Sequence, residues 1–284
     1  MNYVVLNNGV KMPILGFGVF QIPKEDTERI VRDAIDVGFR LFDTAQGYGN
    51  ERGLGEAIRK SGIDRSEFFI TTKIWISEAG YEKAKSSILQ SLQRLNMDYV
   101  DLLLIHQPFG DYYGTYRAME ELYEQGKLKA IGVSNFYSDR LIDLIKFNKI
   151  VPMVNQVETH PFHQQVKAME VMQKYGVQIQ AWAPFAEGKN DLFNNEILVR
   201  IGERHQKTSA QITLRYLIQR GISVLPKTVN KERMRQNFDI FDFELTEAEM
   251  AEILTLDQPQ SQFFSHQDPE TVERLTSLVR KFDE

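Results

Sequence analysis

The sequence of 284 residues contains no cysteine. Without thiols the chain cannot be a disulfide-stapled secreted module, cannot bind zinc or an iron–sulfur cluster through thiolates, and cannot use a cysteine nucleophile. It also has no apolar run approaching the ~18 residues that cross a bilayer, and residues 1–9 place no basic segment before a long apolar stretch. We therefore expect a cytoplasmic protein with no membrane partner.

The sequence also lacks an excess of charge of one sign. Its 34 Lys and Arg residues and 39 Asp and Glu residues leave a formal net charge of −5, and no block is rich in Lys and Arg. Nucleic acid is therefore not expected as a partner. The motifs G-x-G-x-x-G and G-x-x-x-x-G-K-[ST] are missing as well, which excludes the usual dinucleotide and phosphate cradles.

What the sequence does contain is a regular alternation of two patterns. Short runs of β-branched and aromatic residues recur, each followed by a longer stretch in which apolar residues have helical spacing. Eight such units, with no linker between them, predict a parallel sheet closed into a (β/α)8 TIM barrel. The eight runs lie near 14–18 and at 39–42, 68–72, 100–105, 130–133, 153–155, 177–181 and 222–226.

Two inserted segments interrupt or precede the regular units. Asn7-Asn8-Gly9 between short apolar runs predicts an N-terminal β-hairpin, which we expect to plug the barrel bottom. The stretch 182–227, between the seventh and eighth strands, is too long for one crossover helix. It has room for helices near 194–205 and 209–220, so we expect an extra helix before the eighth strand.

A third segment follows Phe243 at the end of the chain. Thr246 and Glu249 form a capping box, which predicts a C-terminal helix over 246–254, and a polar tail follows it. These additions account for the length beyond the roughly 250 residues of a plain barrel. We therefore expect a single barrel domain spanning residues 1–284.

Candidate chemical groups stand where the first barrel strands end. Three runs stop at Asp43, Lys73 and His106, and the active sites of parallel barrels lie at the carboxyl ends of the strands. Tyr48 follows in a short Gly-containing loop that can bring its phenol to this end of the barrel, the barrel mouth. Each residue alone is a weak indication, because many strands end on a solvated polar residue. Their coincidence at one mouth predicts a catalytic quartet.

These four groups suit the donation of a proton to a carbonyl that becomes an alcohol. A nearby ammonium lowers the pKa of a phenol, and a carboxylate keeps that ammonium charged. A neutral His can hydrogen-bond the substrate oxygen. Such a reduction also needs a hydride, which no side chain supplies, so the quartet implies a nicotinamide cofactor.

At these positions the sequence resembles the microbial branch of the aldo-keto reductase superfamily. The resemblance implies that Tyr48 is the proton donor, that Lys73 lowers its pKa, that Asp43 supports Lys73 and that His106 orients the carbonyl. It also implies reduction of aldehydes or ketones with NADPH, bound extended across the barrel mouth without a Rossmann fold. The motifs are DTAQGYGNE at 43–51, TKIW at 72–75, LLIH at 103–106, GVSNF at 132–136, NQVE at 155–158, LPKT at 225–228 and FSHQDPE at 264–270.

The expected cofactor contacts fall into two groups. Around the nicotinamide, an indole offers a stacking face, and a hydroxyl and two amides can satisfy the carboxamide. Around the 2′-phosphate, two cations and a hydroxyl stand at the last strand end and the first turn of the next helix, where an anion is favoured. The first group is Trp182, Ser134, Asn135 and Gln156, and the second is Lys227, Thr228 and Arg233. The resemblance adds Phe185, Gln236 and Asn237, although the family often has Glu where this chain has Gln236.

Two departures from the family concern the substrate. Gln107 follows His106 where many relatives carry Trp, and Phe20 occupies a position often held by Trp. Together with Trp75 and Phe109, both are expected to line the substrate pocket. A pocket that is less apolar near Gln107 favours polar aldehydes, ketones or dicarbonyls. We expect a monomer whose partner is a small carbonyl compound.

Two other classes of function stay open. A cofactor-sensing protein could keep the barrel and bind NADPH yet regulate a partner, although the intact quartet disfavours it. A metal-dependent barrel hydrolase is the third class. His160 and His163 suggest a metal, but Pro161 disfavours a regular helical turn there and no further ligand is obvious, so we predict no metal site.

Overall fold

The computed structural model describes residues 2–278. Within them, eight parallel strands form one sheet in the order of the chain. The Gly16 N–H donates to the Val224 carbonyl at 2.9 Å and the Val224 N–H donates to the Ile14 carbonyl at 2.9 Å, so the sheet closes into a barrel. The predicted (β/α)8 TIM barrel is confirmed. Its strands are β3 (Phe17–Gly18), β4 (Leu41–Asp43), β5 (Phe69–Ile74), β6 (Leu102–Ile105), β7 (Ile131–Ser134), β8 (Val154–Glu158), β9 (Gln178–Trp182) and β10 (Ser223–Val224).

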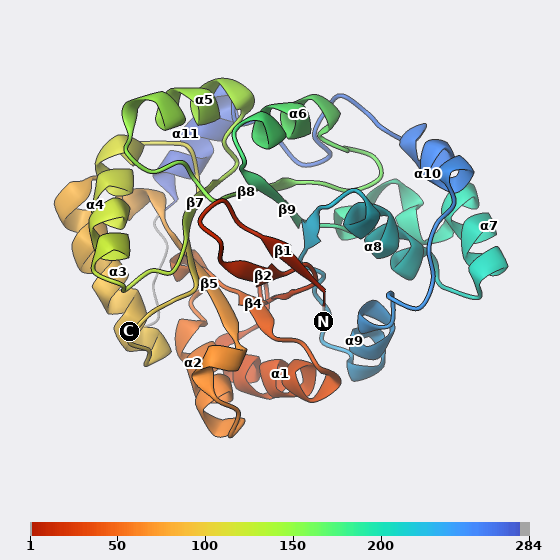
Figure 1. Ribbon diagram of the computed structural model, residues 1–284, viewed down its shortest axis with the longest axis horizontal. Helices are drawn as coiled ribbons and strands as arrows, with labels where there is room; N and C mark the ends of the chain where they lie inside the picture. The colour runs from red at the N-terminus through yellow and green to blue at the C-terminus, as the bar shows by residue number, and fades with distance from the viewer. Residues whose placement is uncertain (1, 279–284) are drawn as a thin grey trace.

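Helices form a ring around the barrel (Figure 1). In α1 the stripe of Ile30, Val31, Ala34 and Ile35 is buried, and the helix ends at Gly38, whose φ of 123° residues with a side chain rarely adopt. No helix within residues 2–278 is long and apolar enough to cross a membrane. The ring consists of α1 (Lys24–Val37), α2 (Glu51–Lys60), α3 (Tyr81–Leu95), α4 (Tyr112–Glu124), α5 (Ser138–Phe147), α6 (Val166–Lys174), α7 (Glu196–His205), α8 (Ser209–Gln219) and α9 (Lys231–Phe238).

The extra helix lies where the sequence predicts it, since α7 and α8 both separate β9 from β10. Asn195 caps α7 by accepting from two backbone N–H groups, and a capping box of Thr208 and Gln211 begins α8. Between β9 and α7 the chain is irregular over Ala186–Asn194, where several residues have positive φ. This irregular segment begins four residues after Trp182, the last residue of β9.

The N-terminal hairpin closes the amino end of the barrel strands. Strands β1 (Tyr3–Val5) and β2 (Lys11–Pro13) pair antiparallel around the predicted turn. Asn7 donates to the carbonyl of Pro152, just before β8, and Asn8 donates to that of Lys129, just before β7. In Figure 1 the hairpin crosses the centre of the barrel. The predicted plug is confirmed.

The C-terminal segment holds one expected helix and one that the sequence analysis did not predict. Helix α10 (Glu247–Leu254) begins with the predicted capping box. The tail then forms α11 (Pro269–Ser277), capped by Asp268 with Pro269 at its start. The sequence predicts only a polar tail here, because the short apolar pattern gives a weak helical signal. Thr271 and Leu275 are buried, so packing against the barrel stabilises α11.

Candidate active site

The inner face of the barrel gathers polar side chains from separate strands. Side chains along a strand alternate between its two faces. The register places Asp43 of β4 beside Thr71 of β5, so that Lys73, two residues further, points to the same face. Gln156 and Gln180 are paired in the same way on β8 and β9. Lys73 is fully buried and Asp43 is 4% exposed, which makes this a polar interior at the strand ends.

Lys73 is the centre of a hydrogen-bond network. Its ammonium donates to the Asp43 carboxylate, to the Thr44 carbonyl at 3.0 Å and to the Tyr48 hydroxyl at 3.3 Å. Burial alone lowers the pKa of Lys73, but the charge of Asp43 and the phenol of Tyr48 outweigh burial and raise that pKa above its ordinary value. The ammonium therefore stays charged, with one of its protons directed at the phenol.

Tyr48 reaches this network from a short 3-10 helix, η1 (Gln46–Tyr48), whose first residue anchors it. Gln46 donates from Nε2 to the hydroxyls of Ser87 at 2.7 Å and Ser91 at 3.0 Å, both on α3. Its Oε1 accepts from the backbone N–H of Trp75 at 3.0 Å. The loop is therefore fixed to α3 and to the end of β5, which restricts the position of the phenol.

Asn50 anchors the other end of the same loop. It donates from Nδ2 to the Val19 carbonyl at 3.0 Å, and its Oδ1 accepts from the Thr44 hydroxyl at 2.7 Å. Gln46 and Asn50 both belong to the motif at 43–51, but no role was predicted for either. The signal that could have found them is the position of two amides on either side of Tyr48, because such side chains satisfy backbone groups of tight loops.

His106 and Tyr48 face each other across the barrel mouth. Their rings are nearly perpendicular, with centroids 5.5 Å apart, and both residues are half-buried. Trp75 packs edge-on against His106 at 5.1 Å, and Phe20 lies 4.8 Å from Tyr48, measured between ring centroids. The structure therefore brings the predicted quartet together and places the expected substrate contacts Phe20 and Trp75 beside it.

Gln156 makes contacts that the sequence analysis did not anticipate. It was expected to bind the cofactor carboxamide, but its Nε2 donates to Asp43 Oδ2 at 2.8 Å and to Gln180 Oε1 at 2.8 Å. Asp43 is therefore held by Lys73 on one oxygen and by Gln156 on the other. Ser134, the neighbouring carboxamide candidate, donates to the Gln156 carbonyl at 2.9 Å. The other atom of the Gln156 amide, Oε1, forms no hydrogen bond within residues 2–278.

Asn135 orients the indole of Trp182, the predicted stacking face. Asn135 follows β7 with a φ of 64°, a left-handed conformation that Asn tolerates better than most residues. Its Oδ1 accepts from the Trp182 indole N–H at 2.8 Å, and its Nδ2 donates to the His106 carbonyl at 3.0 Å. Trp182 is half-buried, and so is Phe185, three residues beyond it.

The predicted phosphate contacts Lys227, Thr228 and Arg233 gather before and in the first turn of α9. Both cations are exposed, and neither forms an ion pair with a carboxylate in the part of the chain that the structure describes. Lys231, in contrast, is paired with two aspartates of α1 at 2.8 and 3.0 Å. Two unpaired cations beside the start of a helix form a positive surface suited to an anion.

Asn230 fixes the backbone around these cations. Its side chain accepts from the Arg233 N–H at 3.0 Å, and its own N–H donates to the Thr228 hydroxyl at 3.2 Å. Further along α9, Gln236 is exposed and Asn237 is buried. Of these two predicted adenine-side residues, only Gln236 presents its side chain at the surface.

The C-terminal tail covers the other two expected substrate contacts. Gln107 and Phe109 are each 7% exposed. His266 of the tail places Nε2 at 2.7 Å from Gln107 Oε1, and its ring centroid is 6.0 Å from that of Phe109. This contact of the tail with the mouth was not predicted, because nothing in the strand and helix periodicity indicates it.

Glu158, at the end of β8, ties the tail to the barrel. Its carboxylate accepts from the Ser261 hydroxyl and, at 2.8 Å, from the Gln262 N–H. His160 lies 3.0 Å from the same carboxylate. Burial alone raises the pKa of Glu158, but these hydrogen bonds outweigh burial and lower it. No group of three or more potential metal ligands occurs among residues 2–278.

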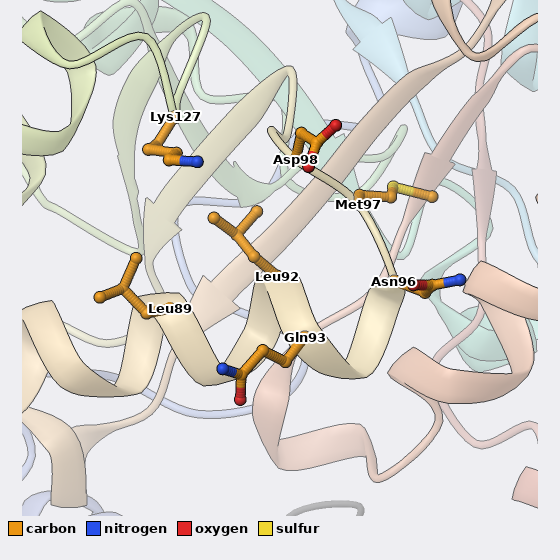
Figure 2. A pocket seen from close by; sticks show the side chains of 7 residues that line it. All are labelled: Leu89, Leu92, Gln93, Asn96, Met97, Asp98 and Lys127. Atoms are coloured by element: carbon orange, nitrogen blue, oxygen red, sulfur yellow. The ribbon is translucent and has the colours of Figure 1, made fainter.

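A hollow of about 530 Å³ lies near the amino ends of the barrel strands, away from the mouth. Figure 2 shows the side chains that line it. Its lining comes from the end of α3 and from loops that precede β6 and β7, and it contains no member of the quartet. It therefore does not belong to the site described above. The lining residues are Leu89, Leu92, Gln93, Asn96, Met97, Asp98 and Lys127.

A buried ammonium and carboxylate that hold a half-buried phenol at a (β/α)8-barrel mouth define an oxidoreductase of carbonyl groups. The aldo/keto reductase family model matches residues 14–258, and the chain belongs to that family. The predicted family and class are confirmed.

Individual relatives agree with this assignment. The chain is 45% identical to the glyoxal reductase of Bacillus subtilis (strain 168) over 260 residues, 90% of this chain and 93% of the relative. It is similar to MGS-M4, an aldo-keto reductase from a Medee basin deep-sea metagenome library, with a TM-score of 0.91 and 44% identity over 93% of this chain and 98% of the other. A Bombyx mori aldo-keto reductase in complex with NADP gives a TM-score of 0.88 at 30% identity, covering 96% of each chain.

Proposed function

We propose that Tyr48 donates the proton in an NADPH-dependent reduction of small aldehydes and ketones to alcohols by this protein. The observation that carries the proposal is the 3.3 Å contact between the Lys73 ammonium and the Tyr48 hydroxyl, opposite His106. Membership of the aldo/keto reductase family supports the carbonyl chemistry. The NADP in the Bombyx mori relative supports the cofactor.

Each member of the quartet has a distinct part in this reaction. NADPH, when bound, supplies the hydride that the carbonyl carbon accepts. Tyr48 gives its proton to the carbonyl oxygen, and the Lys73 ammonium stabilises the phenolate that remains. Asp43 keeps the ammonium charged and in place. His106 orients the carbonyl oxygen by a hydrogen bond, so that the oxygen lies within reach of the phenol.

The residues present fit NADPH at both of its ends. Lys227 and Arg233 are exposed and make no ion pair with a carboxylate within residues 2–278, so a 2′-phosphate can pair with both. At the barrel mouth, the indole of Trp182 is held at a fixed angle by Asn135. Gln156 Oε1 is left to accept from a carboxamide, because the nitrogen of the same amide is already used by Asp43.

We also propose three properties of the whole protein: a single domain over residues 1–284, a monomeric state and a cytoplasmic location. The lack of a linker rich in Pro, Gly or Ser supports the single domain. One cooperative unfolding transition, a monomer mass in light scattering and recovery in the cytosolic fraction are the expected results. Two separate transitions, a dimer mass or a membrane-bound fraction would each contradict the corresponding expectation.

The test is NADPH consumption with a panel of carbonyl compounds, such as methylglyoxal, 4-nitrobenzaldehyde and a diketo sugar acid. Turnover of at least one compound is expected, and Tyr48→Phe should abolish most of it. Tight NADPH binding without turnover of any compound would instead favour the alternative of a cofactor-sensing regulatory protein. Stoichiometric bound metal in elemental analysis would favour the barrel hydrolase.

A further inference from the structure

Within the part of the chain that the structure describes, the side chain of Gln107 forms hydrogen bonds only through its oxygen. Gln107 Oε1 lies 2.7 Å from His266 Nε2 and 3.3 Å from Asn135 Nδ2. Within residues 2–278 its Nε2 donates no hydrogen bond. Solvent reaches this nitrogen, so it is not a buried unsatisfied donor. Gln107 follows His106 directly, so an unused N–H donor stands at the mouth beside a member of the quartet.

The orientation of this amide follows from groups whose hydrogen-bonding roles are fixed. The indole N–H of Trp182 can only donate, so the Asn135 atom that it meets is the oxygen. The carbonyl of His106 can only accept, so the Asn135 atom beside it is the nitrogen. That nitrogen lies near two further acceptors, the Ser134 hydroxyl at 3.2 Å and the Gln107 side chain at 3.3 Å. A Gln107 nitrogen in this place would set two donors against each other, so the facing atom is Oε1. His266 must then donate to the same oxygen from Nε2.

His266 is built into the structure as a neutral donor. It is 4% exposed, and three aromatic rings surround it with centroids 5.0 to 6.0 Å away. Burial lowers the pKa of His266 to about 4; the positive charge of Arg140 acts in the same direction and the negative charge of Glu158 opposes it. At neutral pH the ring therefore carries one proton. The rings belong to Phe109, Tyr137 and Phe264.

We propose that Gln107 donates a hydrogen bond to a second substrate oxygen, next to the reacting carbonyl, and that His266 fixes the amide in the donating orientation. The inference rests on the proposed function, in which Tyr48 and His106 bind the reacting oxygen. The substrate class that fits is aldehydes and ketones with an oxo or hydroxyl group on the adjacent carbon. His266 does not touch the substrate, and it acts as a positioning residue through Gln107.

The kinetic test compares methylglyoxal with propanal, which has the same carbon chain but no second oxygen. In Gln107→Leu we expect kcat/KM for methylglyoxal to fall about 5- to 10-fold, the scale of one hydrogen bond, and that for propanal to change less than about 2-fold. Each variant is compared with the wild type on the same substrate, so aldehyde hydration cancels. Equal losses on both substrates would overturn the inference.

Two substitutions of His266 separate positioning from packing. His266→Gln can still place an N–H near the Gln107 oxygen, so we expect it to keep the preference for methylglyoxal over propanal. His266→Phe fills the aromatic cage but removes the donor, so the amide can rotate and the preference should fall toward that of Gln107→Leu. Loss of the preference in both variants, or in neither, would contradict the positioning role.

Nitrogen NMR of the imidazole rings gives a readout that does not depend on turnover. The chain has five His residues, so the ring signals can be assigned by single substitutions. We expect His266 to be neutral with its proton on Nε2; a proton on Nδ1 would reverse the Gln107 amide and overturn the inference. If the wild type reduces neither methylglyoxal nor propanal, the proposed function fails. If it reduces both and Gln107→Leu does not distinguish them, only the recognition of the second oxygen fails.

Discussion

The ammonium of Lys73 lies 3.3 Å from the hydroxyl of Tyr48. Lys73 has no exposed surface, and its other protons are donated to the Asp43 carboxylate and the Thr44 carbonyl. The position of the cation is therefore set by the barrel interior and not by the solvent. The phenol meets a charge that is already in place before any substrate arrives, which is the condition for electrostatic preorganisation.

Tyr48→Phe is expected to lower the rate of carbonyl reduction by at least ~10²-fold, the scale of losing a general acid. NADPH affinity should be retained, because the hydroxyl that is removed accepts a hydrogen bond from Lys73, which is not one of the expected cofactor residues. Absorbance of NADPH measures the rate, and quenching of tryptophan fluorescence measures binding. Unchanged turnover would rule out Tyr48 as the proton donor.

Lys227→Ala combined with Arg233→Ala is expected to weaken NADPH binding far more than NADH binding, because only NADPH carries the 2′-phosphate that pairs with these cations. Lys231→Ala is the matched control, since Lys231 lies on the same helix as Arg233 but is already paired with Asp33 and Asp36. The control should leave the ratio of the two dissociation constants nearly unchanged. Similar losses for NADPH and NADH in the double variant would place the phosphate elsewhere.

Asp43→Leu is expected to destabilise the fold by about 3–5 kcal/mol, because it leaves the fully buried Lys73 without its counter-charge. In the double variant Asp43→Leu with Lys73→Met, no charge is left unpaired, so much of this free energy of unfolding should return while activity stays lost. Urea unfolding gives the comparison. A double variant no more stable than the single one would show that the buried charge is not the cause.

Acidification is expected to weaken the fold through His266. The pKa of His266 is lowered from 6.5 to about 4 by burial, with Arg140 acting in the same direction and Glu158 against it. Between pH 4 and pH 6.5 the His266 ring binds a proton in the unfolded chain but not in the folded chain. The stability tied to the neutral ring is therefore complete above pH ~6.5 and declines as the pH falls toward 4, by up to about 3 kcal/mol.

His266→Gln removes the titrating ring while keeping an N–H donor, and it serves as the reference for this effect. Between pH 7 and pH 4.5 the wild type should lose more free energy of unfolding than the variant. Chemical denaturation at a series of pH values measures both. Parallel curves over this range would show that another group controls the acid sensitivity.

The barrel and the quartet could be predicted because both depend on local patterns. Strand runs that stop at Asp43, Lys73 and His106 are visible in the sequence, and parallel strands bring their carboxyl ends to one mouth. The position of Tyr48 at the mouth could also be predicted, since the loop between it and Asp43 is short. These residues required only strand order and side-chain alternation, and no knowledge of long-range packing.

The contacts that hold the site in place could not be read from the same patterns. The hydrogen bond from Gln156 to Asp43 joins residues 113 positions apart in the chain, and the one between His266 and Gln107 joins residues 159 positions apart. A hydrogen bond between positions so far apart leaves no period in the sequence. Helix α11 was missed for a related reason: its short stripe becomes helical by packing on the barrel, and local propensity alone gives little signal.

Because of the hairpin and the tail, the two ends of the chain are not equally suitable as fusion sites in protein engineering. The hairpin of β1 and β2 lies at the amino ends of the strands, whereas the carbonyl of Leu278 accepts from the indole N–H of Trp75 at 3.2 Å, beside the quartet. A purification tag or an immobilisation anchor fused before Asn2 leaves the entrance free for diffusing carbonyl compounds. Cargo attached behind Leu278 would continue from the wall of that entrance, so N-terminal attachment is the geometry to use on an electrode or resin.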